Sequence, residues 1–221
     1  MGEAVTFPSN GSTCDGYLAL PAGDGPGVVV IQEWWGLVPH IKDVCERFAG
    51  EGFVAVAPDL YHGKATTEPD EAMKYLMSLE AGQAAKDMSG AVTFLREHER
   101  VSPRKVGVVG FCMGGALTLV LGTIADVDAL VPYYGIPYDE PDWSKISAPV
   151  LGHFAEHDDP GPQKVGELFE KLAAMGKEAE LHVYEGAHHG FFNEDNEGAH
   201  DPQAAATSWQ RTLGFLRSHL S

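Results

Sequence analysis

One short segment of the sequence places a reactive side chain in the setting that nucleophilic catalysis needs. Gly110-Phe111-Cys112-Met113-Gly114-Gly115 follows the apolar run Lys105–Val109 and precedes a segment of helical character. This is the glycine-x-nucleophile-x-glycine pattern of a strand–turn–helix, with cysteine where serine is commoner. Side chains at positions 110 and 114 would collide with neighbouring backbone in so strained a turn. The turn would hold the sulfur of Cys112 at a helix N-terminus, where the helix dipole favours the thiolate.

A cysteine nucleophile of this kind works with a base and with a third group that orients the base. An acidic pair, Asp158-Asp159, follows the strand-like segment that ends at Phe154, and a histidine pair, His188-His189, follows the one that ends at Tyr184. The chain order nucleophile, acid, histidine is a known order for such triads. Spacing alone leaves open which aspartate and which histidine take part.

Other interpretations of these residues stay open at this point. Most free cysteines are small buried apolar residues, which is how we interpret Cys14 and Cys45; the glycine pattern favours a nucleophile at position 112. An aspartate in this place could only cap the next helix. A zinc site is a further alternative, because imidazole and carboxylate are good zinc ligands, and its candidates are His153, His157, Asp158, His188 and His189. No set of them has a recognised ligand spacing, so we expect neither a metal nor another cofactor.

Strand-like and helix-like segments alternate along the chain. The predicted strands are 4–7, 13–20, 27–32, 53–57, 105–110, 129–134, 149–154 and 179–184. The predicted helices are 41–51, 83–99, 113–122, 162–175 and 204–219. From Gly27 onward the strands are apolar throughout, which is typical of a parallel sheet covered by helices on both faces. We expect one domain over residues 1–221, with the less regular segment 60–81 as an insertion or lid.

Composition and charge limit the partners of the chain. The 221 residues carry a formal net charge of −17, which argues against binding to nucleic acid or to an anionic membrane surface. The sequence has neither a signal-peptide pattern nor an apolar run long enough for a membrane span. Its three cysteines have unrelated spacings and do not form a disulfide framework. We therefore expect a cytoplasmic protein, a monomer or small homo-oligomer, that acts on a small molecule.

Taken together, five segments resemble the dienelactone hydrolase family, which are cysteine hydrolases of the α/β-hydrolase superfamily. These segments are Ile31–Gly36, Val56–Tyr61, Val108–Gly115, Tyr133–Gly135 and His189–Phe191. The resemblance runs from Gly27 to the last helix. It implies an α/β-hydrolase fold, with a mostly parallel central sheet flanked by helices on both faces, and a Cys-His-Asp triad.

The resemblance also implies roles for individual residues. The family's histidine directly precedes a small residue and a phenylalanine, which matches His189, and its acid lies shortly before a helix-opening proline, which matches Asp158. Glu33 matches a glutamate that contacts the resting cysteine and helps to activate it. The backbone N–H groups of Trp34 and Met113 match the family's oxyanion hole.

Aromatic residues beside these segments are candidates for the walls of a substrate pocket. We assign Trp35, Tyr134 and Phe191 to this role, while the alternative for Trp34, Trp35 and Tyr134 is that they are core aromatics.

The sequence departs from the family at the positions that hold a substrate carboxylate. Family members that act on dienelactone use arginines there, whereas this chain has Phe192-Asn193 at one place and only Lys64 and Lys74 at the other. Lysine lacks the bidentate fork of arginine. We therefore expect a carboxylic ester hydrolase that cleaves a small ester or lactone, and the missing arginines argue against dienelactone as the substrate. One alternative is a promiscuous esterase or phosphotriesterase-type hydrolase. A second alternative is a non-catalytic binding protein, which the three filled triad positions disfavour.

Overall fold

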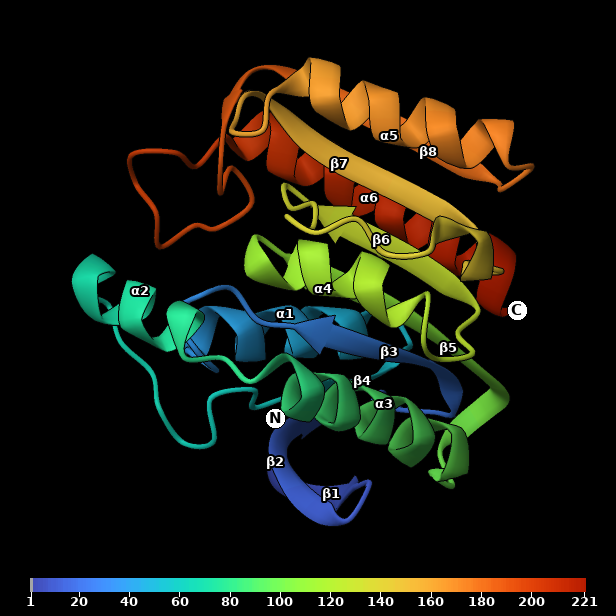
Figure 1. The fold of residues 1–221 in the computed structure, drawn as a ribbon. Helices are drawn as coiled ribbons and strands as arrows, with labels where there is room; N and C mark the ends of the chain where they lie inside the picture. The colour runs from blue at the N-terminus through green and yellow to red at the C-terminus, as the bar shows by residue number, and fades with distance from the viewer. Residues whose placement is uncertain (1) are drawn as a thin grey trace. The chain divides into compact units, whose positions relative to one another are not determined.

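The computed structural model describes residues 2–221, which form an α/β fold with an eight-stranded, mostly parallel sheet (Figure 1). The strands are β1 (Glu3–Ser9), β2 (Ser12–Ala19), β3 (Gly25–Ile31), β4 (Val54–Pro58), β5 (Val101–Phe111), β6 (Ala129–Tyr133), β7 (Val150–His157) and β8 (Ala179–His188). The α-helices are α1 (Pro39–Gly50), α2 (Pro69–Met77), α3 (Ala81–Glu97), α4 (Met113–Leu121), α5 (Pro162–Ala174) and α6 (Pro202–Leu220). The strand order is β1-β2-β4-β3-β5-β6-β7-β8.

The chain divides into two compact units. The first unit runs to Val108 and includes Leu220–Ser221, and the second unit is Val109–His219. The expectation of one domain over residues 1–221 stays a prediction.

In the first unit, β1 pairs with β2 and β2 with β4 in antiparallel fashion, whereas β3 and β4 are parallel. Every residue of β4 is buried, and both α1 and α3 pack against it. A strand that is apolar at every position, instead of alternating, needs such cover on both of its faces.

In the second unit, β6, β7 and β8 are parallel to one another. Successive side chains of β7 point to opposite faces of the sheet. The imidazole of His153 meets Thr212 of α6, and the ring of Phe154 lies 6.1 Å from that of Phe169 in α5. Helices α5 and α6 therefore cover opposite faces of this strand, as their courses along β7 in Figure 1 also show.

The predicted strands and helices are all present, with shifted ends, but one α-helix was not predicted. Helix α2 lies inside the segment that the sequence left irregular. It spans only nine residues, although Ala72, Leu76 and Met77 have helical spacing, and the only residue that it buries is Ala72. Pro69 opens it, and Asp70 and Glu71 complement the helix dipole in its first turn.

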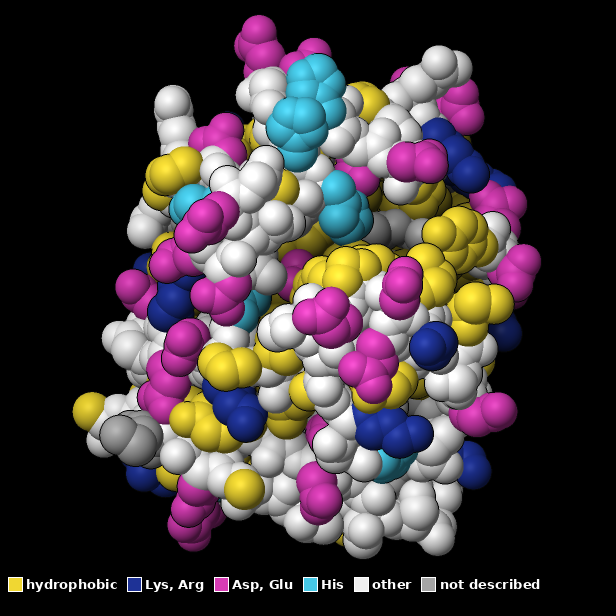
Figure 2. All heavy atoms as spheres, turned by 90° about the vertical axis from the view of Figure 1, so that its left-hand side faces the viewer, with side chains coloured by type: hydrophobic (Ala, Val, Ile, Leu, Met, Phe, Trp, Pro, Cys, Tyr) yellow, Lys and Arg dark blue, Asp and Glu magenta, His cyan; other side chains and the backbone are white. Residues whose placement is uncertain are grey.

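The surface of the protein carries its acidic excess. Figure 2 shows acidic side chains spread over the face that it draws, with fewer lysines and arginines among them. None of the helices in the described part of the chain is both long and apolar enough to cross a bilayer.

Candidate active site

Cys112 occupies a sharp turn between the end of β5 and the start of α4. Its φ of 55° and ψ of −118° lie outside the regions that non-glycine residues favour. Its N–H donates to the carbonyl of Tyr133 over 3.1 Å, and its own carbonyl accepts from Gly115 over 2.9 Å. Residues held in such strained conformations occur most often at functional sites. The side chain is partly exposed, whereas Cys14 and Cys45 are buried.

Glycines make this turn possible. A Cβ atom added at Gly110 would lie 2.1 Å from the carbonyl oxygen of Gly114. Gly135, to which the sequence analysis gave no role in this turn, also meets it: an added Cβ there would lie 1.9 Å from the carbonyl oxygen of Cys112. The glycines that make room for the turn at Cys112 therefore include one that is distant in sequence.

We expect Gly135→Ala to destabilise the protein by about 1–3 kcal/mol, because its methyl group would overlap the backbone of Cys112. Gly214→Ala in α6 is the matched control, since nothing lies within 4 Å of the added atom. That variant should be stabilised by up to about 1 kcal/mol. Urea unfolding of both variants measures the difference. Equal stability of the two would contradict the assigned role of Gly135.

An acid and a histidine meet at the ends of β7 and β8. Nδ1 of His189 lies 2.8 Å from Oδ1 of Asp158, whose side chain is only 5 % exposed. Asp159 is exposed, and its N–H donates to the same carboxylate oxygen over 2.8 Å. His188 still belongs to β8 and is in register with His157. Of the two pairs that the sequence left open, Asp158 and His189 are thus the two that contact each other.

Cys112 is the second group that influences the titration of His189. Burial lowers the pKa of His189, but the hydrogen bonds to Asp158 and Cys112 and the charges of both groups outweigh it and raise the pKa to about 10. The imidazole therefore keeps its proton at neutral pH. Because the folded pKa lies above the ordinary value of 6.5, this proton stabilises the folded state below pH 6.5, and the contribution is lost as the pH rises through about 10.

In the Cys112→Ala protein we expect the pKa of His189 to be lower than in the wild type. The substitution removes both a hydrogen bond and a charge that raise it, and leaves those of Asp158. NMR titration of the imidazole nitrogens in the two proteins measures the change. An unchanged midpoint would show that Cys112 and His189 do not interact.

Two aromatic residues predicted to form pocket walls are buried. Phe191 is 0 % exposed and Tyr134 is 2 % exposed. The Tyr134 ring packs 5.0 Å from the imidazole of His189 and 5.3 Å from the ring of Phe191. Tyr134 therefore packs against His189 and restricts its ring, and Phe191 packs behind Tyr134. The pocket roles of both residues stay predictions.

The other predicted site residues are placed as follows. Met113 is the first residue of α4 in the second unit. Glu33, Trp34 and Trp35 lie in the first unit, directly after β3, where Glu33 is 3 % exposed. The two indole rings are partly exposed and meet edge to face, 4.9 Å apart. The activating role of Glu33, the oxyanion roles of Trp34 and Met113, and the pocket role of Trp35 stay predictions.

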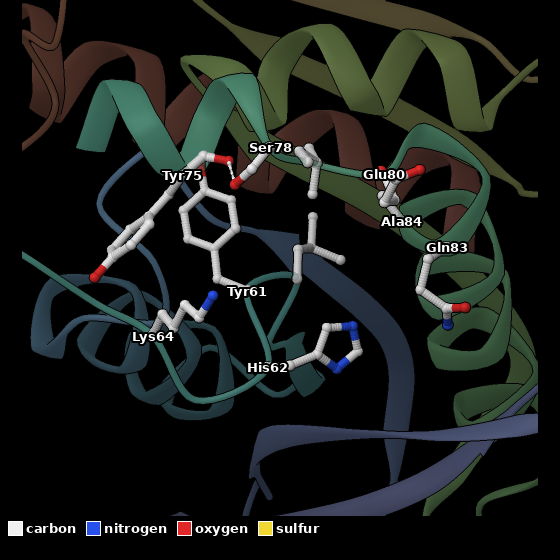
Figure 3. Close-up of a pocket in the computed structure, with 10 residues that line it drawn as sticks. Tyr61, His62, Lys64, Tyr75, Ser78, Glu80, Gln83 and Ala84 are labelled. Carbon is white, nitrogen blue, oxygen red and sulfur yellow. Dashed lines mark hydrogen bonds between the residues drawn. The ribbon is translucent and has the colours of Figure 1, made fainter. Parts of the chain in front are cut away.

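Lys64 lines a pocket of about 240 Å³ in the first unit (Figure 3). The lining residues are Leu60, Tyr61, His62, Lys64, Tyr75, Ser78, Leu79, Glu80, Gln83 and Ala84. Figure 3 shows Lys64 beside the rings of Tyr61 and Tyr75, and its Nζ lies 5.9 Å from the centroid of the Tyr75 ring. At the other place where the family has an arginine, Phe192 is 0 % and Asn193 5 % exposed.

The residues of the alternative zinc site are dispersed. His153 lies in the core with both ring nitrogens hydrogen-bonded, whereas His157 and His188 are exposed with their rings 4.9 Å apart. Within residues 2–221, no group of three or more His, Cys, Asp or Glu side chains is arranged to hold a metal ion.

Comparisons with known proteins identify relatives of the chain. The chain is 40% identical to Protein usf of Aquifex pyrophilus and 34% identical to the "Putative carboxymethylenebutenolidase" of Aquifex aeolicus, in each case over 100% of both chains. The crystal structure of a dienelactone hydrolase-like promiscuous phosphotriesterase from metagenomic libraries superposes with a TM-score of 0.89. It covers 100% of this chain and 99% of that one at 22% identity, so it supports the fold alone.

The sequence profile of the dienelactone hydrolase family matches residues 14–220, which is nearly the whole chain. With this match and relatives of 40% and 34% identity over the whole chain, the chain belongs to the dienelactone hydrolase family.

Proposed function

We propose that the protein hydrolyses a small carboxylic ester or lactone through a Cys112-His189-Asp158 triad. The observation that carries the proposal is the 2.8 Å contact between His189 Nδ1 and Asp158 Oδ1, beside a cysteine in the strained turn. The family match and the relative named as a carboxymethylenebutenolidase support the reaction class.

In the first half of the reaction the Cys112 sulfur attacks the carbonyl carbon of the substrate. The carbonyl electrons move onto oxygen and form a tetrahedral oxyanion. As this intermediate collapses, the bond to the leaving oxygen breaks, and His189 donates its Nε2 proton to that oxygen. The products are an alcohol and a thioester on Cys112. With a lactone, the alcohol stays attached to the acyl group.

In the second half His189, now neutral, takes a proton from water, and the oxygen of that water attacks the thioester carbon. The carbon–sulfur bond then breaks, and Cys112 leaves as a thiolate beside the protonated imidazole. The raised pKa of His189 favours this return to the resting pair, because the imidazole retains the proton at neutral pH. Asp158 holds Nδ1 throughout, so that Nε2 faces the sulfur.

The predicted accessory groups fit the same scheme. The N–H groups of Met113 and Trp34 would stabilise the oxyanion, and such preorganised donors are typically worth about 2.7–4 kcal/mol each. Met113 N is at the first residue of α4, where the helix dipole adds to the effect. Glu33 would activate the thiol when the substrate arrives.

A hydrolysis panel tests the proposal: p-nitrophenyl acetate, a dienelactone and a phosphotriester. We expect turnover of carboxylic esters or lactones, with kcat/KM for the phosphotriester at least about tenfold lower. The reason is that the oxyanion hole is expected to match the tetrahedral oxyanion of acyl transfer, whereas attack at phosphorus passes through a trigonal-bipyramidal geometry. A higher value for the phosphotriester would favour the promiscuous alternative. Inactivity on every substrate would favour a protein that only binds.

A further inference from the structure

A fully buried histidine lies on β7 in the second unit. His153 is 0 % exposed, and a buried polar ring is costly unless its nitrogens find partners. Nδ1 lies 2.9 Å from the Tyr184 hydroxyl and Nε2 lies 3.1 Å from Thr212 Oγ1. Burial lowers the pKa of His153 well below its usual range, and the nearby charges of His182 and Arg211 act in the same direction. The ring is therefore neutral, with one nitrogen donating and the other accepting.

The partners of His153 extend the hydrogen bonds in both directions. Arg211 Nη1 donates to the Tyr184 hydroxyl over 3.2 Å, and a guanidinium can only donate. Hydroxyl groups both donate and accept, so Tyr184 and Thr212 can satisfy either neutral form of the His153 ring. Thr212 Oγ1 in turn lies 2.7 Å from the Tyr133 hydroxyl. We call Arg211, Tyr184, His153, Thr212 and Tyr133 the His153 chain.

The His153 chain links the two strands that precede the acid and the base. Tyr184 of β8 and His153 of β7 are joined by their side chains, and Asp158 and His189 directly follow the ends of these strands. The register of β7 against β8 is irregular between Ala155 and His157, just after this link. Such an irregularity disrupts the ladder locally, so the link holds the register of the strands up to the segment before Asp158 and His189.

The same chain reaches the backbone that holds the nucleophile. The carbonyl of Tyr133 accepts from the N–H of Cys112 over 3.1 Å. The N–H of Tyr134, whose ring packs on His189, donates to the carbonyl of His153 over 2.8 Å. The His153 chain thus connects β6, whose Tyr133 holds the backbone of Cys112, with β7 and β8, which end directly before Asp158 and His189.

We propose that His153, Tyr184 and Thr212 are positioning residues, whose hydrogen bonds hold β6, β7 and β8 in the register that brings Cys112, Asp158 and His189 together. The proposal rests on the proposed function of these three residues. It assigns a task to polar side chains that touch neither substrate nor the reacting atoms. A displacement of about 1 Å in such a site is enough to cost about 100-fold in rate.

Near-isosteric variants separate positioning from general stability. Thr212→Val and Tyr184→Phe each remove one hydroxyl from the His153 chain and keep the shape of the side chain. Thr212→Ser restores the hydroxyl at the same position. Ser9→Ala is the matched control, because it removes an equally buried hydroxyl, bonded to Asp87, from the first unit.

Two measurements are made on each variant. For the substrate that the wild type hydrolyses best, we expect Thr212→Val and Tyr184→Phe to lower kcat by about 10- to 100-fold with little change in KM. The kcat values of Thr212→Ser and Ser9→Ala should stay within about threefold of the wild-type value, even where the Tm of the variant falls. The second measurement is the pH profile of Cys112 alkylation by iodoacetamide. It needs no substrate, and Cys14 and Cys45 are 0 % exposed.

We expect the alkylation profile to shift in Thr212→Val and Tyr184→Phe and to match the wild type in Thr212→Ser. A wild-type kcat together with an unshifted alkylation profile in Thr212→Val would overturn the proposal. The His153 chain would then have a purely structural role. If the wild type hydrolyses no ester while these profiles still shift, the proposed function fails and the positioning role stands.

Discussion

Cys112→Ala is expected to lower kcat/KM for p-nitrophenyl acetate by about 10⁴-fold. The substitution removes the atom that forms the covalent bond to the substrate. The fold should tolerate it, because alanine keeps the Cβ and the turn is held by backbone hydrogen bonds to Tyr133 and Gly115. Residual activity would come from binding and from the oxyanion donors. Steady-state kinetics of the wild type and the variant on the same substrate measure the loss.

The other two cysteines provide the controls for this prediction. Cys14 and Cys45 are 0 % exposed, and burial, with the nearby charge of Asp87 as the next cause, raises the pKa of Cys14 to about 12. Burial likewise raises the pKa of Cys45. Neither is a thiolate at neutral pH, so Cys14→Ala and Cys45→Ala should retain the activity of the wild type. Full activity of Cys112→Ala would contradict the proposed mechanism.

Asp158→Asn is expected to lower kcat by about 10²- to 10⁴-fold, with a smaller change in KM. The amide has nearly the same shape as the carboxylate but carries no charge and can hold the imidazole in the wrong tautomer. The substitution also removes the charged partner whose hydrogen bond and charge raise the pKa of His189, so the pKa of His189 should fall. Kinetics and NMR titration of the same variant report the two effects.

The neighbouring aspartate makes a strict control. Asp159→Asn leaves in place the backbone N–H that donates to Asp158. It changes an exposed side chain, so activity within about threefold of the wild type is expected. Similar losses of activity in Asp158→Asn and Asp159→Asn would mean that catalysis depends on the negative charge of this loop and not on the contact with His189.

Part of this site could be predicted from local sequence, because its geometry is local. The strained turn at Cys112 needs glycine nearby, and Gly110 and Gly115 stand beside it in the chain. Gly135 meets the same turn through a contact that is distant in sequence, so no spacing rule indicates it. For the same reason the residues alone did not decide which of two aspartates and which of two histidines belong to the triad. The choice depends on where β8 ends, since His188 is still in the strand and His189 is not.

The fold was predictable where burial leaves a pattern. The apolar strands indicated a covered parallel sheet, whereas α2 spans only nine residues and buries only Ala72, so its segment was left irregular. Aromatic residues near a site do not reveal their exposure in the sequence, so the sequence did not indicate that Phe191 is 0 % exposed. His153 is visible as a polar residue in an apolar strand. Its partners Tyr184 and Thr212, however, lie on other elements.

Mass spectrometry of the acylated enzyme tests the covalent step on Cys112. The wild type is mixed with p-nitrophenyl acetate, quenched in acid during turnover, digested and analysed. We expect one acetyl group on the peptide that contains Cys112, and we expect it to disappear once the substrate is consumed. Steady hydrolysis with no acetyl group on Cys112, or with the acetyl group on another side chain, would contradict the covalent mechanism.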